Sequence, residues 1–254
     1  MTDDKRPFVA LTGFRFRLWP IVLAAVLMQV LLVAGREAAR WLFFQGTAVW
    51  GQHVSVFLIL AILLQAALGF AAVAAMARLL PQADPNLRWP PGRSYVGLAI
   101  LIGIAMGLIM LVADYWPALL AHTPPDDSYS TSTFDSVGYL IGMLITGLAE
   151  ETIFRGLLVG MLIVLVPGRL RIGRLDLPVA AYLVALMFGL AHYQSFMVDP
   201  FHQALAQQIY AFSWGLTYVW LMERSRSLLA PMVTHGVGNF TEVAIVIALG
   251  ATWA

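Results

Sequence analysis

The chain has 254 residues, of which 60% are hydrophobic and only 11% charged, and its mean hydropathy is +0.80. Soluble domains carry about 25% charged residues, so this composition excludes a globule with water on all sides. The net charge of +1 and the absence of cysteine indicate no nucleic-acid partner, no disulfide and no thiolate metal site. We therefore expect membrane lipid to cover most of the surface.

Several stretches are apolar and long enough to cross a bilayer, for which a helix needs about 20 residues. They lie near Leu18–Gly35, Val54–Ala77, Ser94–Ala113, Phe134–Val166, Pro178–Gln194, Phe201–Met222 and Leu228–Gly250. The predicted fold class is all-α, a polytopic transmembrane helical bundle of about seven spans, within a range of six to eight. The range arises because the first stretch also fits a cleavable signal peptide, and because the uncharged segment Trp41–His53 can dip into the membrane.

The orientation of the bundle follows from the positions of lysine and arginine in the loops. With a cytoplasmic N-terminus, the cytoplasmic segments hold twelve basic residues: Lys5, Arg6, Arg15, Arg17, Arg78, Arg88, Arg93, Arg169, Arg171, Arg174, Arg224 and Arg226. The opposite side holds two, Arg36 and Arg40, and also Asp114, Asp126, Asp127, Asp135 and Asp199. We therefore expect the N-terminus to be cytoplasmic and the C-terminus to be external.

One basic residue, Arg155, falls inside a predicted span, and other polar side chains occupy the apolar segments with it. They are Glu150, Glu151, His192, His235, Asn239 and Glu242. An ionisable group at the bilayer centre costs at least about 2.5 kcal/mol, so such groups usually lie in the protein interior and serve its function. These residues are therefore the candidate site.

Two glutamates and an arginine are combined on one predicted helix. Glu151 and Arg155 are four residues apart and share a face, where their attraction offsets part of the burial cost. Glu150 lies about 100° around the helix from Glu151 and is free to face a cavity. A desolvated carboxylate beside another negative charge is more basic, which suits a general base. We predict Glu150 as the base and Glu151 with Arg155 as the orienting pair; the alternative is a purely structural ion pair.

On the last predicted span His235 and Asn239 are also four residues apart, and Glu242 follows on the same stripe. A histidine and an asparagine one turn apart can hold a water, a metal ion or a carbonyl oxygen. The alternative for His235 is an interhelical hydrogen-bond donor without a chemical role. We expect Glu242 to line a water-filled crevice.

A further histidine, His192, follows Phe188 by four residues, so we expect the phenyl ring to pack against the imidazole. Helix rise places Glu150 and His235 at similar depths in the membrane. The same arithmetic places His192 nearer the outer side, unless Pro178 begins its helix some way into the membrane.

Three motifs run through these segments: EExxxR at Glu150–Arg155, FxxxH at Phe188–His192 and HxxxN at His235–Asn239. In this order they resemble the CPBP family of intramembrane proteases, which includes type II CAAX prenyl endopeptidases and Abi-like relatives linked to bacteriocin immunity and processing. The resemblance covers residues 134–250 and implies a four-span catalytic core, after a variable three-span region over residues 1–133. It also implies an integral protein of the cell membrane of a prokaryote that hydrolyses a peptide bond of a membrane-associated or lipidated protein or peptide.

Two mechanisms are compatible with this resemblance. In the first, Glu150 and His192 activate a water while His235 and Asn239 stabilise the oxyanion. In the second, His192, His235 and Glu150 hold Zn²⁺, the one cofactor that the family label of metalloprotease keeps open. We favour the first, because the HExxH signature is absent and asparagine is an uncommon zinc ligand.

Two other classes of function stay open. A proton-coupled transporter or channel would use the same ionisable residues as a relay, although no internal repeat supports it. A non-catalytic membrane immunity or scaffold protein would leave the site unused. The sequence indicates neither the identity of the substrate nor an oligomeric state.

Overall fold

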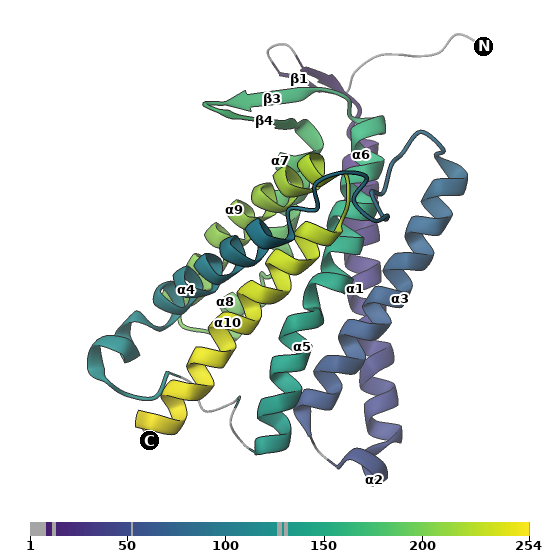
Figure 1. Ribbon diagram of the computed structural model, residues 1–254. Helices are drawn as coiled ribbons and strands as arrows, with labels where there is room; N and C mark the ends of the chain where they lie inside the picture. Colours follow the sequence, from purple (N-terminus) through teal and green to yellow (C-terminus); the bar gives the residue numbers. More distant parts are fainter. Residues whose placement is uncertain (1–8, 12–13, 52, 126–128, 130–131, 254) are drawn as a thin grey trace, which may run out of the picture.

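The computed structural model describes residues 9–11, 14–51, 53–125, 129 and 132–253, and most of them are helical (Figure 1). The helices are α1 Trp19–Gln45, α2 Thr47–Trp50, α3 Val54–Leu79, α4 Val96–Ala121, α5 Thr133–Glu151, the π-helix η1 Thr152–Val159, α6 Gly160–Leu165, α7 Val179–Ala191, α8 Ser195–Val198, α9 Phe201–Ser225 and α10 Leu229–Trp253. The strands β1 Val9–Leu11 and β2 Phe14–Phe16 form one antiparallel pair, and β3 Arg169–Ile172 and β4 Leu175–Pro178 another. The predicted all-α bundle is confirmed, with two short hairpins that the sequence analysis did not predict.

Each of the seven predicted spans is helical, but the helices differ in how apolar they are. In the described part of the chain, five segments are long and apolar enough to cross a membrane: α1, α3, α4, Val179–Val198 and α10. The continuous stretch from α5 to α6 is outside this group and carries Glu150, Glu151 and Arg155. So is α9, which begins with a polar run that includes Gln203 and Gln207. Both glutamines line an internal cavity, which explains the polar face of α9.

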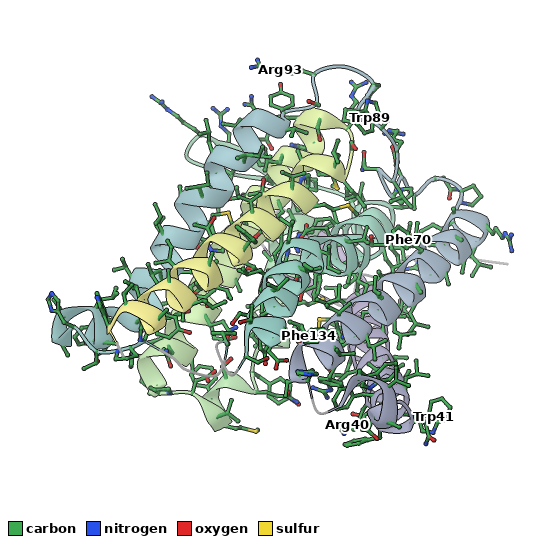
Figure 2. All side chains as sticks on the ribbon, turned by 60° about the horizontal axis from the view of Figure 1, so that its bottom comes forward. Arg40, Trp41, Phe70, Trp89, Arg93 and Phe134 are labelled. Carbon is green, nitrogen blue, oxygen red and sulfur yellow. The ribbon has the colours of Figure 1, made fainter. Side chains whose placement is uncertain are left out.

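The long helices pass up and down between two ends of the bundle. Figure 1 shows the α3–α4 connection, the β3–β4 hairpin and the α9–α10 connection at one end, and α2 with the start of α5 at the other. Trp89 and Arg93 lie at the first end and Arg40 and Trp41 at the second (Figure 2). Trp89 is 78% exposed and Trp41 63% exposed, as expected for aromatic side chains at the two edges of a bilayer. The basic α3–α4, β3–β4 and α9–α10 connections therefore share one end, as predicted, whereas Lys5, Arg6, Asp126 and Asp127 lie outside the described residues.

Helices α1 and α4 extend furthest beyond the predicted spans, and this corrects the assignment of three charged residues. The helix α1 continues to Gln45, so that Arg36 and Arg40 lie on it rather than in an outer loop. The helix α4 continues to Ala121 and includes Asp114. Hydrophobicity marks where apolar residues end, whereas a helix continues through alanine, glutamate and arginine, which all favour it. The uncharged segment Trp41–His53 forms the end of α1 and the short α2.

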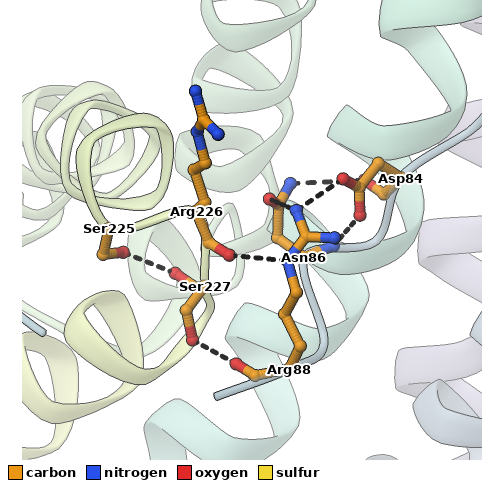
Figure 3. A network of polar contacts seen from close by, with 6 residues as sticks. All are labelled: Asp84, Asn86, Arg88, Ser225, Arg226 and Ser227. Carbon is orange, nitrogen blue, oxygen red and sulfur yellow. Dashed lines mark hydrogen bonds and ion pairs between the residues drawn. The ribbon is translucent and has the colours of Figure 1, made fainter. Parts of the chain in front are cut away.

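A polar network fixes the beginning of α10 to the α3–α4 connection (Figure 3). The hydroxyl of Ser227 donates a hydrogen bond to the carbonyl of Arg88, and Nε of Arg88 donates to the carbonyl of Arg226 at 3.0 Å. The other end of the Arg88 guanidinium contacts Asp84 at 2.7 Å. Asn86 and Arg226 both adopt a left-handed backbone, with φ of 51°, at the two bends that meet here. The connection thus sets the position of the helix that carries His235.

Glycines allow α10 to pack closely between α4 and α5. A Cβ atom on Gly107 of α4 would lie only 2.5 Å from the carbonyl oxygen of Gly238 and 2.6 Å from Cβ of Thr241. On α5, a Cβ atom at Gly147 would collide with the backbone of Met232. Small residues at such crossings let helix backbones approach each other within a membrane. The two contacts fix α10 from both sides.

Candidate active site

Glu151 and Arg155 form a fully buried ion pair at the junction of α5 and η1. Nη1 of Arg155 lies 3.1 Å from Oε1 of Glu151, and neither side chain is exposed to solvent. The guanidinium carbon of Arg155 lies 4.5 Å from the ring centroid of Phe188 and 4.8 Å from that of Tyr218. Aromatic faces attract a cation and shield it from the apolar surroundings. The predicted pairing of Glu151 with Arg155 is therefore what the structure contains.

The wide turns of η1 begin directly after the two glutamates. Thr152 to Val159 adopt the π-helical hydrogen-bond pattern, and all eight residues of this segment are buried. Single π-helical turns are rare and occur mostly at functional sites. The apolar pattern predicts one regular helix over this stretch, because hydrophobic periodicity does not distinguish a π-turn from an α-turn.

His235 lies between the two glutamates. Its Nδ1 is 2.7 Å from Oε1 of Glu151, and its Nε2 is 3.8 Å from Oε2 of Glu150. The ring of Tyr218 stacks on the imidazole, with centroids 5.1 Å apart and an angle of 11° between the planes. The orientation of His235 is thus determined by a carboxylate at one nitrogen and by an aromatic ring along one face.

His192 terminates α7 and approaches the same centre. Its Nδ1 lies 2.8 Å from the carbonyl oxygen of Phe188, so a proton on Nδ1 leaves Nε2 with a free lone pair. The ring of Phe188 meets the imidazoles of His192 and His235 edge-on, at centroid distances of 5.2 and 5.9 Å. Phe188 therefore packs against both histidines and against Arg155. The helix-rise estimate placed His192 nearer the outer side of the membrane, but in the structure His192 lines the same cavity as Glu150 and His235.

A cavity of about 520 Å³ brings the candidate residues together. Its polar lining includes Glu150, His192, His235, Asn239 and Glu242. A second cavity of about 200 Å³, between α1 and the end of α7, is lined by Glu150 and His192 as well. Glu150 has a side-chain exposure of 22%, in contrast to the enclosed Glu151. The two adjacent glutamates thus face different surroundings, as their angular separation on a helix requires.

A group of residues around this cavity was not recognised in the sequence. Asp114 accepts a hydrogen bond from the hydroxyl of Tyr210 at 3.0 Å, and its carboxyl group also contacts that of Glu242. Tyr218 and Trp214 line the cavity from α9, and Arg36 lines it from α1. The sequence pattern places Asp114 and Arg36 in loops, whereas the structure places them on α4 and α1. No periodicity singled out the aromatic residues, which look like ordinary packing residues of an apolar helix.

The side chains do not form a ready metal site. Among the residues that the structure describes, no group of three or more histidine, cysteine, aspartate or glutamate side chains is arranged to hold a metal ion. Nδ1 of His235 is paired with Glu151 and Nδ1 of His192 with a backbone carbonyl, so only the Nε2 atoms of the two rings are available to an ion. A catalytic zinc needs three protein ligands directed at one point. The described side chains are not arranged as such a group, and zinc binding by Glu150, His192 and His235 stays a prediction.

The comparison with known families applies to this part of the chain. Residues 132–241 match the family model described as type II CAAX prenyl endopeptidase Rce1-like. The matched segment contains all three motifs and ends just before Glu242; Arg36 and Asp114 lie outside it. No curated protein matches the chain. Over residues 132–241 the chain is thus similar to the Rce1-like type II CAAX prenyl endopeptidases.

Proposed function

We propose that the protein is an intramembrane endopeptidase in which Glu150 activates a water molecule for attack on a peptide bond. The observation that carries this proposal is the position of Glu150, which lines both cavities beside His192 and lies 3.8 Å from His235. The similarity of the matched segment to an endopeptidase family supports the same reaction. The substrate is a membrane-associated or lipidated protein or peptide that reaches the cavity from the bilayer or its surface.

The charges of the site suggest a different role for each of its ionisable residues. Glu151 is paired with Arg155, and a proton on each nitrogen of His235 would balance the charge of Glu150. Buried charges are tolerated when they are paired in this way. In this state Nδ1–H of His235 donates to Glu151, and Nε2–H is available to a substrate oxygen. Glu151 and Arg155 act as positioning residues for the imidazole.

The reaction proceeds in two steps. Glu150, assisted by Nε2 of His192, takes a proton from water as the water oxygen bonds to the scissile carbonyl carbon. The negative charge that forms on the carbonyl oxygen accepts hydrogen bonds from His235 and from the amide of Asn239, and loss of one such donor costs about 2.7–4 kcal/mol. The carbon–nitrogen bond then breaks, and the amine takes the proton from Glu150. The products are a carboxylic acid and a free amine.

A cleavage assay with the reconstituted protein tests this function. The protein is incubated with lipidated and transmembrane peptides, and the fragments are identified by mass spectrometry. We expect cleavage that is lost in Glu150→Gln, because an amide cannot accept the proton. Cleavage that persists in this variant would refute the role of Glu150. Ion-dependent flux through proteoliposomes without cleavage would favour a transporter instead.

The metal-free chemistry has a separate test. The metal content of the purified protein is measured alongside Glu150→Ala and His235→Ala. We expect no stoichiometric zinc and the same trace content in all three proteins. Stoichiometric zinc that is lost in the two variants would show that these residues are metal ligands, and the water would then be activated by the metal.

A further inference from the structure

Arg36 is a cationic side chain at the cavities that the proposed reaction does not use. It lies on α1, outside the segment matched by the family, and lines both the larger and the smaller cavity. Among the described residues around the two cavities, it is the only arginine or lysine. The larger cavity also contains several acidic side chains: Asp114, Glu150, Asp199 and Glu242. Away from His235, an anionic group of a bound molecule would therefore find its favourable position at Arg36.

The guanidinium of Arg36 has unused hydrogen-bonding capacity. Its Nη1 donates to Oε1 of Gln194 at 3.0 Å, but its Nε is buried without a hydrogen-bond partner. The carboxylate of Glu37 is 3.8 Å from Nε and pairs more closely with Arg40, at 2.9 Å. Glu37 is 47% exposed, and ion pairs in contact with solvent contribute little. A buried donor without a partner is costly, and a bound carboxylate would remove that cost.

The helix packing holds Arg36 at this position. A Cβ atom on the preceding Gly35 would lie 3.1 Å from Cα of Gln65 on α3, so the two helices meet here. The side-chain amide of Gln65 donates to the carbonyl of Leu32 at 3.1 Å, which joins the same helices by a hydrogen bond. Gln65 itself lines both cavities. The base of the Arg36 side chain thus belongs to a close contact between two long helices rather than to a loop.

The smaller cavity has the position and the lining of a subsite. It shares Glu150 and His192 with the larger cavity, so a peptide carbonyl at Glu150 would lie where the two meet. Its remaining polar lining includes Gln29, Arg36 and Gln194. Amide groups and one guanidinium suit a peptide segment that carries a single negative charge, because arginine binds a carboxylate through two parallel hydrogen bonds.

From these observations we infer that Arg36 forms a subsite in the smaller cavity for a carboxylate of the peptide substrate. The inference rests on the proposed function for the nature of the ligand. Two sources supply this chemistry: the C-terminal carboxylate of the peptide, or an acidic side chain near the scissile bond. In either case one side of the cleaved bond occupies the smaller cavity, and the other side occupies the larger one.

A binding experiment with the full chain tests the subsite without cleavage. The Glu150→Gln protein in lipid nanodiscs is titrated with dansyl-labelled apolar tetrapeptides, and the Kd is measured by fluorescence anisotropy. Each peptide is supplied as a C-terminal carboxylate, as a C-terminal amide, and as an amide with one glutamate. We expect at least one carboxylate form to bind about tenfold more tightly than the plain amide. Preference for the first form identifies the C-terminus, and preference for the third identifies a side chain.

Matched variants show whether Arg36 is responsible. In Arg36→Gln the ratio of amide to carboxylate Kd should fall to about one, while Arg36→Lys should keep part of it because the charge remains without the planar fork. Arg40→Gln is the control: Arg40 is one turn away on α1, pairs with Glu37 and lines neither cavity. Equal binding of all forms by the parent protein, no binding at all, or a preference that survives Arg36→Gln would overturn the subsite.

The outcome is separable from that of the proposed function. The chain with Glu150 intact is incubated with the same peptides, and cleavage is followed by mass spectrometry. Cleavage of carboxylates and amides with equal KM would support the protease and overturn the subsite. Arg36-dependent binding without cleavage of any peptide would support the subsite and overturn the protease.

Discussion

Nδ1 of His235 lies 2.7 Å from the same carboxylate oxygen of Glu151 that accepts a hydrogen bond from Arg155 at 3.1 Å. One oxygen atom therefore connects the helix α10 to the ion pair between α5 and η1. Because Glu151 is completely buried, no solvent can replace it as the hydrogen-bond acceptor of Arg155 and His235. The adjacent Glu150 is partly exposed to the cavity, where water can replace its carboxylate, and it lies farther from His235, at 3.8 Å.

The two glutamates should therefore respond differently to the same substitution. Glu151→Gln removes the charge that Arg155 and His235 share, and breaking a buried pair in this way costs about 3–5 kcal/mol. We expect a lower Tm and loss of activity in Glu151→Gln, but loss of activity with an unchanged Tm in Glu150→Gln. Thermal unfolding of both detergent-solubilised proteins provides the measurement. An equal loss of Tm in the two variants would contradict this division of roles.

Tyr218 should influence the reaction through its ring rather than its hydroxyl. The ring stacks on His235 and also faces Arg155. Tyr218→Phe keeps both contacts, and we expect a kcat within about twofold of the parent value. Tyr218→Leu removes them, and an aromatic contact worth about 0.5–1.5 kcal/mol corresponds to a kcat about two- to tenfold lower. Equal rates for the leucine and phenylalanine variants would exclude a positioning role for the ring.

The planar group of Arg155 should not be replaceable by lysine. In Arg155→Lys the positive charge remains next to Glu151, but a compact ammonium cannot fill the space between Phe188 and Tyr218 as a guanidinium does. We expect a lower Tm and a reduced kcat, with a smaller effect on KM because Arg155 lines neither cavity. The exposed Arg78→Lys, in the last turn of α3, is the control, and its Tm should change much less. A Tm for Arg155→Lys equal to that of the control would contradict the expectation.

The local part of the site could be predicted from the sequence, because helix geometry relates residues that are close in the chain. The spacing of Glu151 and Arg155 predicted their pairing, and the angle to Glu150 predicted a different environment for it. The bundle itself followed from the apolar segments. Their ends did not, since charged residues such as Arg36 and Asp114 continue a helix as readily as they begin a loop.

The contacts between helices could not be predicted from the sequence, for a different reason. The stacking of Tyr218 on His235 depends on the angle and position at which α9 and α10 cross. A single sequence does not indicate how two helices that are apart in the chain cross each other. The π-helix η1 was not predicted either, because its wider turns barely change the spacing of the hydrophobic residues. The metal question shows the same limit. Two histidines and a glutamate satisfy a zinc ligand count, but among the described residues no three such side chains are arranged to hold an ion.

The crossing of α4 and α10 should be the point at which a single methyl group disrupts the site. In Gly107→Ala the new Cβ would lie 2.5 Å from the carbonyl oxygen of Gly238, which forces α4 away from the helix that carries His235. Gly97→Ala, on the same helix, meets no atom within 4 Å and should be neutral or stabilising by up to about 1 kcal/mol, since alanine favours helix. We expect Gly107→Ala alone to lower both Tm and kcat. Thermal unfolding and cleavage rates of the two variants are measured under the same conditions. Equal Tm and equal kcat in the two alanine variants would contradict the close crossing.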